Sequence, residues 1–234
     1  MTTSSTRSRP ASNLPLIANF DSAHLTIGAG VAIFHLATSH VVVCYHSKEK
    51  YWFLPKGRRD AGEDSATGAE REGFEESGYR NRLLPIPLRH RQPQAHNSND
   101  TVSPFAVEPV WTQLLPVTRS TQYMLFWYIA ETLPPDIEQS LSQKSTQANG
   151  AYMTPPPYPA TMTLAERIVL NKKLDPVRHE NTGVNEDEAL YESYLLSVDE
   201  AQQKLSGTIM ADVVRTGWEA IQTRMAMEES SKSA

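Results

Sequence analysis

The chain has 234 residues, of which 39% are hydrophobic and 21% are charged, and its formal net charge is −5. This length and composition indicate one domain with extensions and a hydrophobic core, and they exclude wholesale disorder. The acidic balance differs from the basic footprint of a duplex-DNA binder, and no run of about 18 apolar residues is present that would span a membrane.

The first part of the chain predicts a tail. Residues 1–25 are polar, irregular and interrupted by proline, and the first ten lack the apolar segment of a secretory signal. Their Ser, Thr and Arg content keeps a transit peptide as an alternative interpretation. Cys44 is the single cysteine, so an internal disulfide and a thiolate metal cage are excluded, and its apolar neighbours predict a buried side chain. A reducing compartment follows, and we expect a cytoplasmic protein, with the nucleus as an alternative.

Residues 28–54 contain three short β-branched and aromatic runs, which predict three strands with tight connections. Residues 65–77 then predict a helix. Asp64 or Ser65 can cap its first turn, and Thr67 with Glu70 offers a capping box. Gly78 stands where a helix-ending glycine belongs.

The rest of the chain continues the mixed pattern. Residues 107–115 and 123–130 predict strands, the second buried on both faces. Residues 83–91 predict an edge strand or an extended segment, because two prolines share one face. A strand at 191–196 and helices at 199–205 and 208–227 follow. These elements are typical of a mixed α/β (α+β) domain.

Residues 132–185 differ in composition from the segments on either side. Residues 132–160 are rich in Pro, Ser, Gln and Thr, which predicts that 132–185 is a mobile insertion. Thr163 and Glu166 form a capping box before an apolar pattern, so we expect one short helix inside it. Residues 26–131 and 186–228 are therefore expected to form a single domain around this insertion.

Three glutamates stand on one face of the predicted helix at 65–77. Glu72, Glu75 and Glu76 are spaced i, i+3 and i+4, which places them within an arc of roughly 100°. Like charges one turn apart repel, and a divalent cation would convert this repulsion into binding. Carboxylate oxygens suit Mg²⁺ or Mn²⁺, and residues 54–79 contain no Cys or His for zinc.

A basic glycine loop precedes this helix. Lys56, Arg58 and Arg59 flank Gly57, and glycine allows close backbone approach while the cations suit phosphate. An acidic metal cluster beside such a loop indicates phosphoryl chemistry, in which a metal bridges phosphate oxygens and activates water. The loop is not a P-loop, because no Gly-Lys-Ser/Thr stands at the required spacing.

Together, these residues resemble the signature of the Nudix hydrolases. The matching positions are Gly57, Glu63, Arg71, Glu72, Glu75, Glu76, Gly78 and Tyr79. Gly73 departs from the signature, which has a bulky or aliphatic residue there. The resemblance implies a Nudix-like α/β/α sandwich with a mixed sheet, which cleaves a diphosphate linkage in a small phosphorylated substrate by water attack.

The resemblance also implies roles for these positions. The three motif glutamates would hold one to three Mg²⁺ or Mn²⁺ ions, with the Gly57 carbonyl as a further ligand. Glu63 and Arg71 would pair the loop with the helix, and Gly78 belongs to the same structural frame. The general base varies within the family: Glu72 is our first choice, and the alternatives are Glu131, Glu186 and Glu188.

The substrate is predicted to be rich in phosphate. Leu54-Pro55-Lys56-Gly57 resembles the approach to the motif in Nudix enzymes of dinucleoside polyphosphates and of diphosphoinositol polyphosphates. The cations expected to bind the substrate are Lys56, Arg58, Arg59, Arg89 and Arg91. ADP-ribose or another nucleoside-diphosphate sugar is the alternative, since Pro93 lies fifteen residues after Gly78. A catalytically weak Nudix-fold binding or scaffold module is the alternative of a different class, and the oligomeric state stays open.

Overall fold

The computed structural model describes residues 17–93, 103–147, 152–171 and 174–232. Eight strands form one mixed sheet in these parts of the chain. The strands are β1 Leu25–His35, β2 His40–His46, β3 Tyr51–Phe53, β4 Lys56–Arg58, β5 Asn81–Leu83, β6 Trp111–Pro116, β7 Gln122–Thr132 and β8 Tyr191–Ser197. The helices are α1 Ser65–Ser77, α2 Pro135–Gln147, α3 Leu164–Leu170, α4 Val198–Lys204 and α5 Ile209–Lys232.

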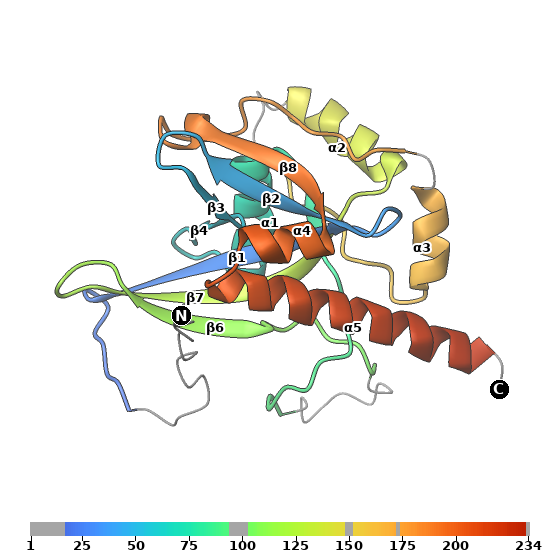
Figure 1. Cartoon of the computed structure of the whole chain (residues 1–234), viewed down its shortest axis with the longest axis horizontal. Coiled ribbons are helices and arrows are strands. Elements are labelled where there is room, and N and C mark those ends of the chain that lie inside the picture. The colour runs from blue at the N-terminus through green and yellow to red at the C-terminus, as the bar shows by residue number, and fades with distance from the viewer. Residues whose placement is uncertain (1–16, 94–102, 148–151, 172–173, 233–234) are drawn as a thin grey trace, which may run out of the picture.

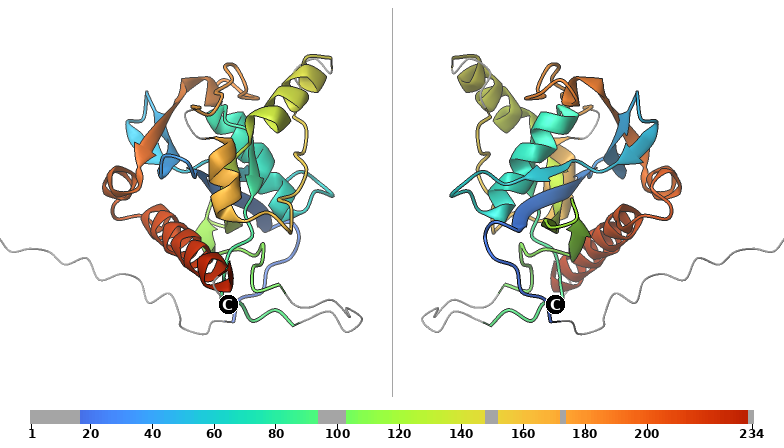
Figure 2. Two further views of the ribbon diagram at one scale, coloured as in Figure 1. Left: turned by 90° about the vertical axis from the view of Figure 1, so that its right-hand side faces the viewer. Right: turned by 90° about the vertical axis from the view of Figure 1, so that its left-hand side faces the viewer.

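The sheet is built around β1 and β7, which run parallel at its centre (Figure 1). Its main path is β3-β2-β1-β7-β5, while β4 pairs with β1, β6 with β7 and β8 with β2. The alternating side chains of β1 supply both faces: Val31 and Ile33 pack with α1, whereas Ala32 and Phe34 pack with α4 and α5. Figure 2 shows α1 and α5 on opposite sides of the sheet, so the predicted mixed α/β sandwich is confirmed.

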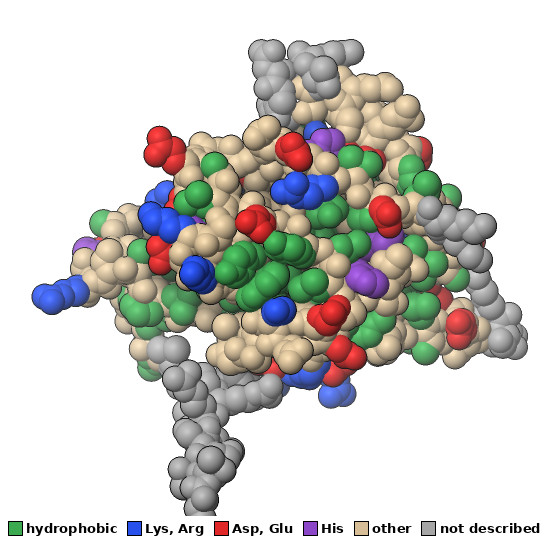
Figure 3. Space-filling view, turned by 45° about the horizontal axis from the view of Figure 1, so that its top comes forward, with side chains coloured by type: hydrophobic (Ala, Val, Ile, Leu, Met, Phe, Trp, Pro, Cys, Tyr) green, Lys and Arg blue, Asp and Glu red, His purple; other side chains and the backbone are tan. Residues whose placement is uncertain are grey.

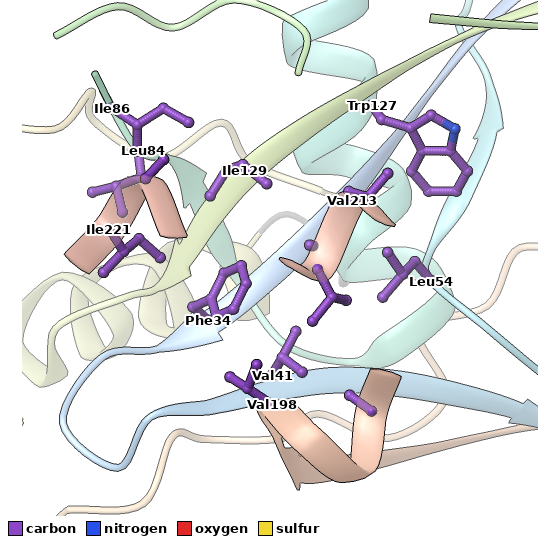
Figure 4. Packing of buried hydrophobic residues seen from close by; sticks show 14 of the residues in the cluster. Phe34, Val41, Leu54, Leu84, Ile86, Trp127, Ile129, Val198, Val213 and Ile221 are labelled. Atoms are coloured by element: carbon purple, nitrogen blue, oxygen red, sulfur yellow. The ribbon is translucent and has the colours of Figure 1, made fainter. Parts of the chain in front are cut away.

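The larger core lies between the sheet and the C-terminal helices. Figure 4 shows Phe34, Ile129, Val213 and Ile221 converging from β1, β7 and α5. Cys44 is buried, as its apolar run predicts. In the space-filling view of Figure 3, further hydrophobic side chains gather at the centre of one face, with charged side chains around them.

The strands predicted within 28–54, at 123–130 and at 191–196 are present, and the strand predicted at 107–115 begins later, at Trp111. Of the two alternatives predicted for 83–91, the edge strand is wrong beyond Leu83, where β5 ends and only the isolated bridge Ile86↔Ala106 follows. The Thr67–Glu70 capping box is also absent: Asp64 caps α1 by accepting from the amides of Ala66 and Thr67. The Glu70 carboxylate instead accepts from the Leu83 amide of β5.

The described parts of 132–185 hold more secondary structure than the composition of this segment predicts. The expected capping box at Thr163 opens α3, but α2 is a second helix that the sequence did not indicate. Tyr158 and Leu164 are buried in the larger core, and Arg167 is buried against Glu131. The prediction of a mobile insertion therefore needs correction for residues 152–171, whose buried side chains belong to the core. No helix in the described parts of the chain is long and apolar enough to cross a membrane.

Candidate active site

Helix α1 carries the three motif glutamates and is held close to the sheet. Asp64 caps its start, and Gly78 ends it in the left-handed region at φ 76°. Gly73, the departure from the signature, stands where α1 crosses the sheet: a Cβ there would lie 2.9 Å from Val31 Cγ1 and would also strike Asn81. Glycine at this position therefore allows the close approach of α1 to β1 and β5.

Two of the glutamates reach the backbone of β4. Glu76 accepts a hydrogen bond of 2.7 Å from the Lys56 amide. The carboxylate of Glu72 lies directly against Gly57, where any Cβ would collide with it. Both side chains are almost fully buried, with 7% exposure for Glu72 and 9% for Glu76. The pairing of β4 with β1 and the packing of α1 on β1 thus bring loop and helix together.

Arg71 connects the glutamates to the loop. Its guanidinium forms ion pairs with Glu63 at 2.9 Å, Glu72 at 3.0 Å and Glu75 at 2.7 Å. It also donates to the Arg58 carbonyl at 2.9 Å. The contact predicted between Glu63 and Arg71 is therefore present.

Burial disfavours the charged forms of these carboxylates. It raises the pKa of Glu72 to about 7 and that of Glu76 to about 8, and it also raises the pKa of Glu75. Arg71 opposes the shift at Glu72 and Glu75, and Lys56 opposes it at Glu76. The negative charge of Glu188, which lines the cleft beside Glu75 and Glu76, adds to the rise of all three pKa values.

A cleft of about 310 Å³ opens beside the end of α1. Glu75, Glu76, Glu188 and Tyr191 line it, together with the segment 178–183. Two hydrogen bonds of 2.8 Å fix that segment to α1. The Thr182 hydroxyl donates to the Glu75 carbonyl, and the backbone N–H of His179 donates to the Gly78 carbonyl. The sequence analysis did not identify 178–183 as part of the site, because this segment contacts residues of α1 that lie about a hundred positions earlier in the chain.

The NUDIX domain family model matches residues 25–146. The chain belongs to the Nudix hydrolase family. The mouse (Mus musculus) protein Nucleoside diphosphate-linked moiety X motif 6 is 33% identical over 88 residues. That match covers 36% of this Nudix chain and only 28% of the mouse protein.

Several solved structures are similar to this Nudix protein at low sequence identity. A NUDIX hydrolase from Nitrosomonas europaea has a TM-score of 0.41 and 12% identity, covering 82% of this chain and 86% of that one. An Ap4A hydrolase binary complex from C. elegans has a TM-score of 0.39 and 15% identity, covering 81% and 93%. A UDP-X diphosphatase has a TM-score of 0.40 and 11% identity, covering 90% and 66%.

Nudix hydrolases generally use divalent metal ions, and the carboxylate oxygens of this cluster are the type of ligand that such ions take. The carboxylates of Glu72 and Glu76 lie against consecutive residues of β4, and the carboxylate of Glu75 shares Arg71 with Glu72, so oxygen donors of the kind that hard cations take are close together here. In the described parts of the chain, however, no group of three or more His, Cys, Asp or Glu side chains is arranged to hold a metal. Arg71 engages Glu72 and Glu75, and the Lys56 amide engages Glu76. Each of these contacts uses one oxygen of the carboxylate, so a metal would be held by the second oxygens or after the side chains rearrange.

The structure separates the candidates for the general base. Glu188 lines the cleft, whereas Glu186 is exposed and does not. Glu131 is wrong as a candidate, because it is fully buried between Arg82 and Arg167, each at 2.7 Å.

Strand register also separates Glu131 from the site. It lies opposite Phe34, whereas Gly57 lies opposite Ala29. Five residues of strand therefore separate the two positions, or about 16 Å along β1.

The five predicted substrate-binding cations do not share one place. Lys56 adjoins the cluster, and Arg58 is exposed on β4. The Arg59 guanidinium donates to the Glu63 carbonyl at 2.7 Å, so it supports the loop. Arg89 and Arg91 are exposed and follow a stretch that packs in the core on the α5 side, away from the α1 face.

Proposed function

We propose that this protein is a Mg²⁺-dependent diphosphohydrolase. The observation that supports this most directly is the convergence of Glu72 and Glu76 on consecutive residues of β4, with Glu75 at the adjoining cleft. Buried carboxylates without enough cationic partners are costly, and a divalent cation removes that cost. Mn²⁺ is the alternative ion, since it takes the same oxygen ligands.

Water attacks one phosphorus of the diphosphate linkage. The bond from that phosphorus to the bridging oxygen breaks, and the other phosphate leaves with the bonding electrons. Bound Mg²⁺ would supply charge neutralisation at the phosphate oxygens. The attacking water gives its proton to a carboxylate of the chain. Glu72 remains our first choice as this base, because a pKa of about 7 suits proton transfer near neutral pH.

Glu188 is the second candidate for the base. It lies in the cleft, and its carboxylate is held by the amide of Val184 and by Asn185. We expect Glu188→Gln to lower kcat by at least ~100-fold if Glu188 takes the proton, and by much less if Glu72 does. Measuring kcat for Glu188→Gln at saturating Mg²⁺ separates the two candidates.

The substrate is proposed to be rich in phosphate. Lys56 is the best-placed cation, because its charge already acts on Glu76 and its amide binds that carboxylate. Arg58 lies two residues after Lys56, at the end of β4, and is exposed. Their charges suit a dinucleoside polyphosphate or a diphosphoinositol polyphosphate, with ADP-ribose or another nucleoside-diphosphate sugar as the alternative.

One observation favours a different class of function. Arg71 already satisfies Glu72 and Glu75, as expected if the site has become a binding module with weak catalysis. The two functions differ in turnover, so a phosphate-release assay distinguishes them.

The proposal is tested by measuring phosphate release with Mg²⁺ from each of the three substrate classes. We expect Glu76→Gln to lower kcat by at least ~100-fold, because it removes a charged ligand. Glu219→Gln, on the exposed side of α5, is the matched control and should keep full activity. Full turnover by Glu76→Gln in EDTA, with circular dichroism unchanged, would defeat the proposal.

A further inference from the structure

Four aromatic rings form a continuous group beside the glutamate cluster, here called the aromatic shelf: His46, Tyr51, Phe53 and Tyr191. Tyr191 lines the cleft, and its ring centroid lies 4.8 Å from Phe53 and 5.2 Å from His46. Tyr51 lies 5.5 Å from Phe53 and 5.4 Å from His46. The shelf therefore runs from the cleft to Tyr51 at the edge of the sheet.

The members of the shelf differ in exposure. Phe53 and His46 are buried and support it from below, whereas Tyr51 is 45% exposed. An exposed tyrosine is ordinary by itself, but this one packs against His46 and Phe53, which both contact the cleft-lining Tyr191. Its exposed part is accessible to a ligand, while the two buried rings support it.

Phe53 connects the aromatic shelf to Lys56, the cation proposed to bind phosphate. Lys56 Nζ lies 5.7 Å from the centroid of Phe53, the same ring that packs against Tyr51. Phe53 therefore lies between Lys56 and Tyr51, and a ligand whose phosphates contact Lys56 has the exposed Tyr51 within reach. A nucleobase has a π-face that stacks on an aromatic side chain, whereas an inositol ring has none.

We propose that Tyr51, supported by His46 and Phe53, stacks the base of a nucleoside polyphosphate whose phosphates lie at Lys56 and the glutamates. This inference rests on the proposed function, and it selects the nucleotide over the inositol substrate. Asp187 adds polarity at the shelf, since it lies 3.5 Å from His46 Nε2 and accepts from the Tyr191 hydroxyl.

The test compares two probes that differ in the base. Dissociation constants are measured with Mg²⁺ for a methylene-bridged, non-hydrolysable dinucleoside polyphosphate and for inorganic tripolyphosphate. We expect Tyr51→Ala to raise the dissociation constant of the nucleotide at least ~5-fold and to leave that of tripolyphosphate nearly unchanged. Tyr51→Phe keeps the ring and should bind the nucleotide like the wild type.

Tyr194→Ala is the matched control. Tyr194 is 39% exposed, lies three residues after Tyr191 on β8 and contacts Trp52, so it faces the other side of the sheet. It should bind both probes like the wild type. Equal losses for both probes in Tyr51→Ala, or no loss for either with circular dichroism unchanged, would overturn the inference. The proposed function fails separately, if the wild type releases no phosphate from any diphosphate.

Discussion

Glu76→Gln is expected to flatten the pH dependence of stability in the metal-free protein. Burial raises the pKa of Glu76 from 4.5 to about 8 in the folded state. Between these pH values the folded protein holds a proton that the unfolded chain has released. The free energy of unfolding contributed by this group is therefore fully present below pH 4.5 and is lost as pH rises toward 8.

The size of the effect follows from the shift. One pKa unit corresponds to about 1.4 kcal/mol, so the shift at Glu76 sets an upper bound of about 5 kcal/mol. Glu72 titrates beside it with a pKa of about 7, and the two carboxylates share the loss. We expect the wild type to lose roughly 2–4 kcal/mol more than Glu76→Gln between acidic and mildly alkaline pH. For a chain of this length, that is a difference in Tm of about 5–15 °C.

The assay is thermal unfolding in EDTA across this pH range, for the wild type and for Glu76→Gln. A second series adds Mg²⁺, which should raise the Tm of the wild type more at alkaline than at acidic pH because protons compete for the carboxylates. Parallel Tm–pH curves for the two proteins in EDTA would refute the reasoning, since they would show that Glu76 carries no raised pKa in the folded state.

Three other substitutions probe the frame around the site. Arg167→Met should lower the free energy of unfolding by about 3 kcal/mol, because it leaves the buried Glu131 with one partner, and urea denaturation measures this. Gly57→Ala should lower kcat by about 100-fold in the phosphate-release assay, because its Cβ displaces the Glu72 carboxylate. Tyr158→Ala should lower the free energy of unfolding by about 3 kcal/mol in urea, because it empties a core position.

Each of these changes has a control of the same type. Arg215→Ala removes exposed ion pairs on α5 and should cost less than about 1 kcal/mol. Gly68→Ala lies inside α1, where the new Cβ would be 3.1 Å from Glu63 Oε2, a side-chain end that can move, so it should lower kcat far less than Gly57→Ala. Met227→Ala removes a partly exposed side chain and should barely change the urea midpoint. Equal effects in a variant and its control would contradict the corresponding prediction.

The sequence predicts the elements whose patterns are local. Helix α1 follows from its end signals, Asp64 and Gly78, and β7 from its apolar run. Helix α2 could not be predicted in this way, because few of its apolar residues reach the core. Instead, its buried Glu138 contacts Arg80 and His179, and partners so far along the chain leave no local pattern.

The site shows the same division. The spacing of Glu72, Glu75 and Glu76 predicts a shared helix face, and the structure places their carboxylates together near β4. The cleft wall at 178–183 depends on the pairing of Tyr79 with Arg178, which joins segments about a hundred residues apart. A sequence pattern identifies a chemical group, but only the fold identifies what faces it.

Charge balance distinguishes the candidate active site from Glu131, a buried acid elsewhere in this domain. Glu131 has two arginine partners, so its charge is matched and its place is structural. At the cluster, the guanidinium of Arg71 is shared by Glu63, Glu72 and Glu75, and Lys56 is the cation that acts on Glu76, so in these contacts four carboxylates share two cationic partners. Such a deficit of positive charge does not stabilise the fold. The deficit raises the pKa of the buried acids and so favours their neutral forms. Under the proposed function, a divalent cation held by these carboxylates would supply the missing charge and would neutralise the phosphate oxygens of the substrate.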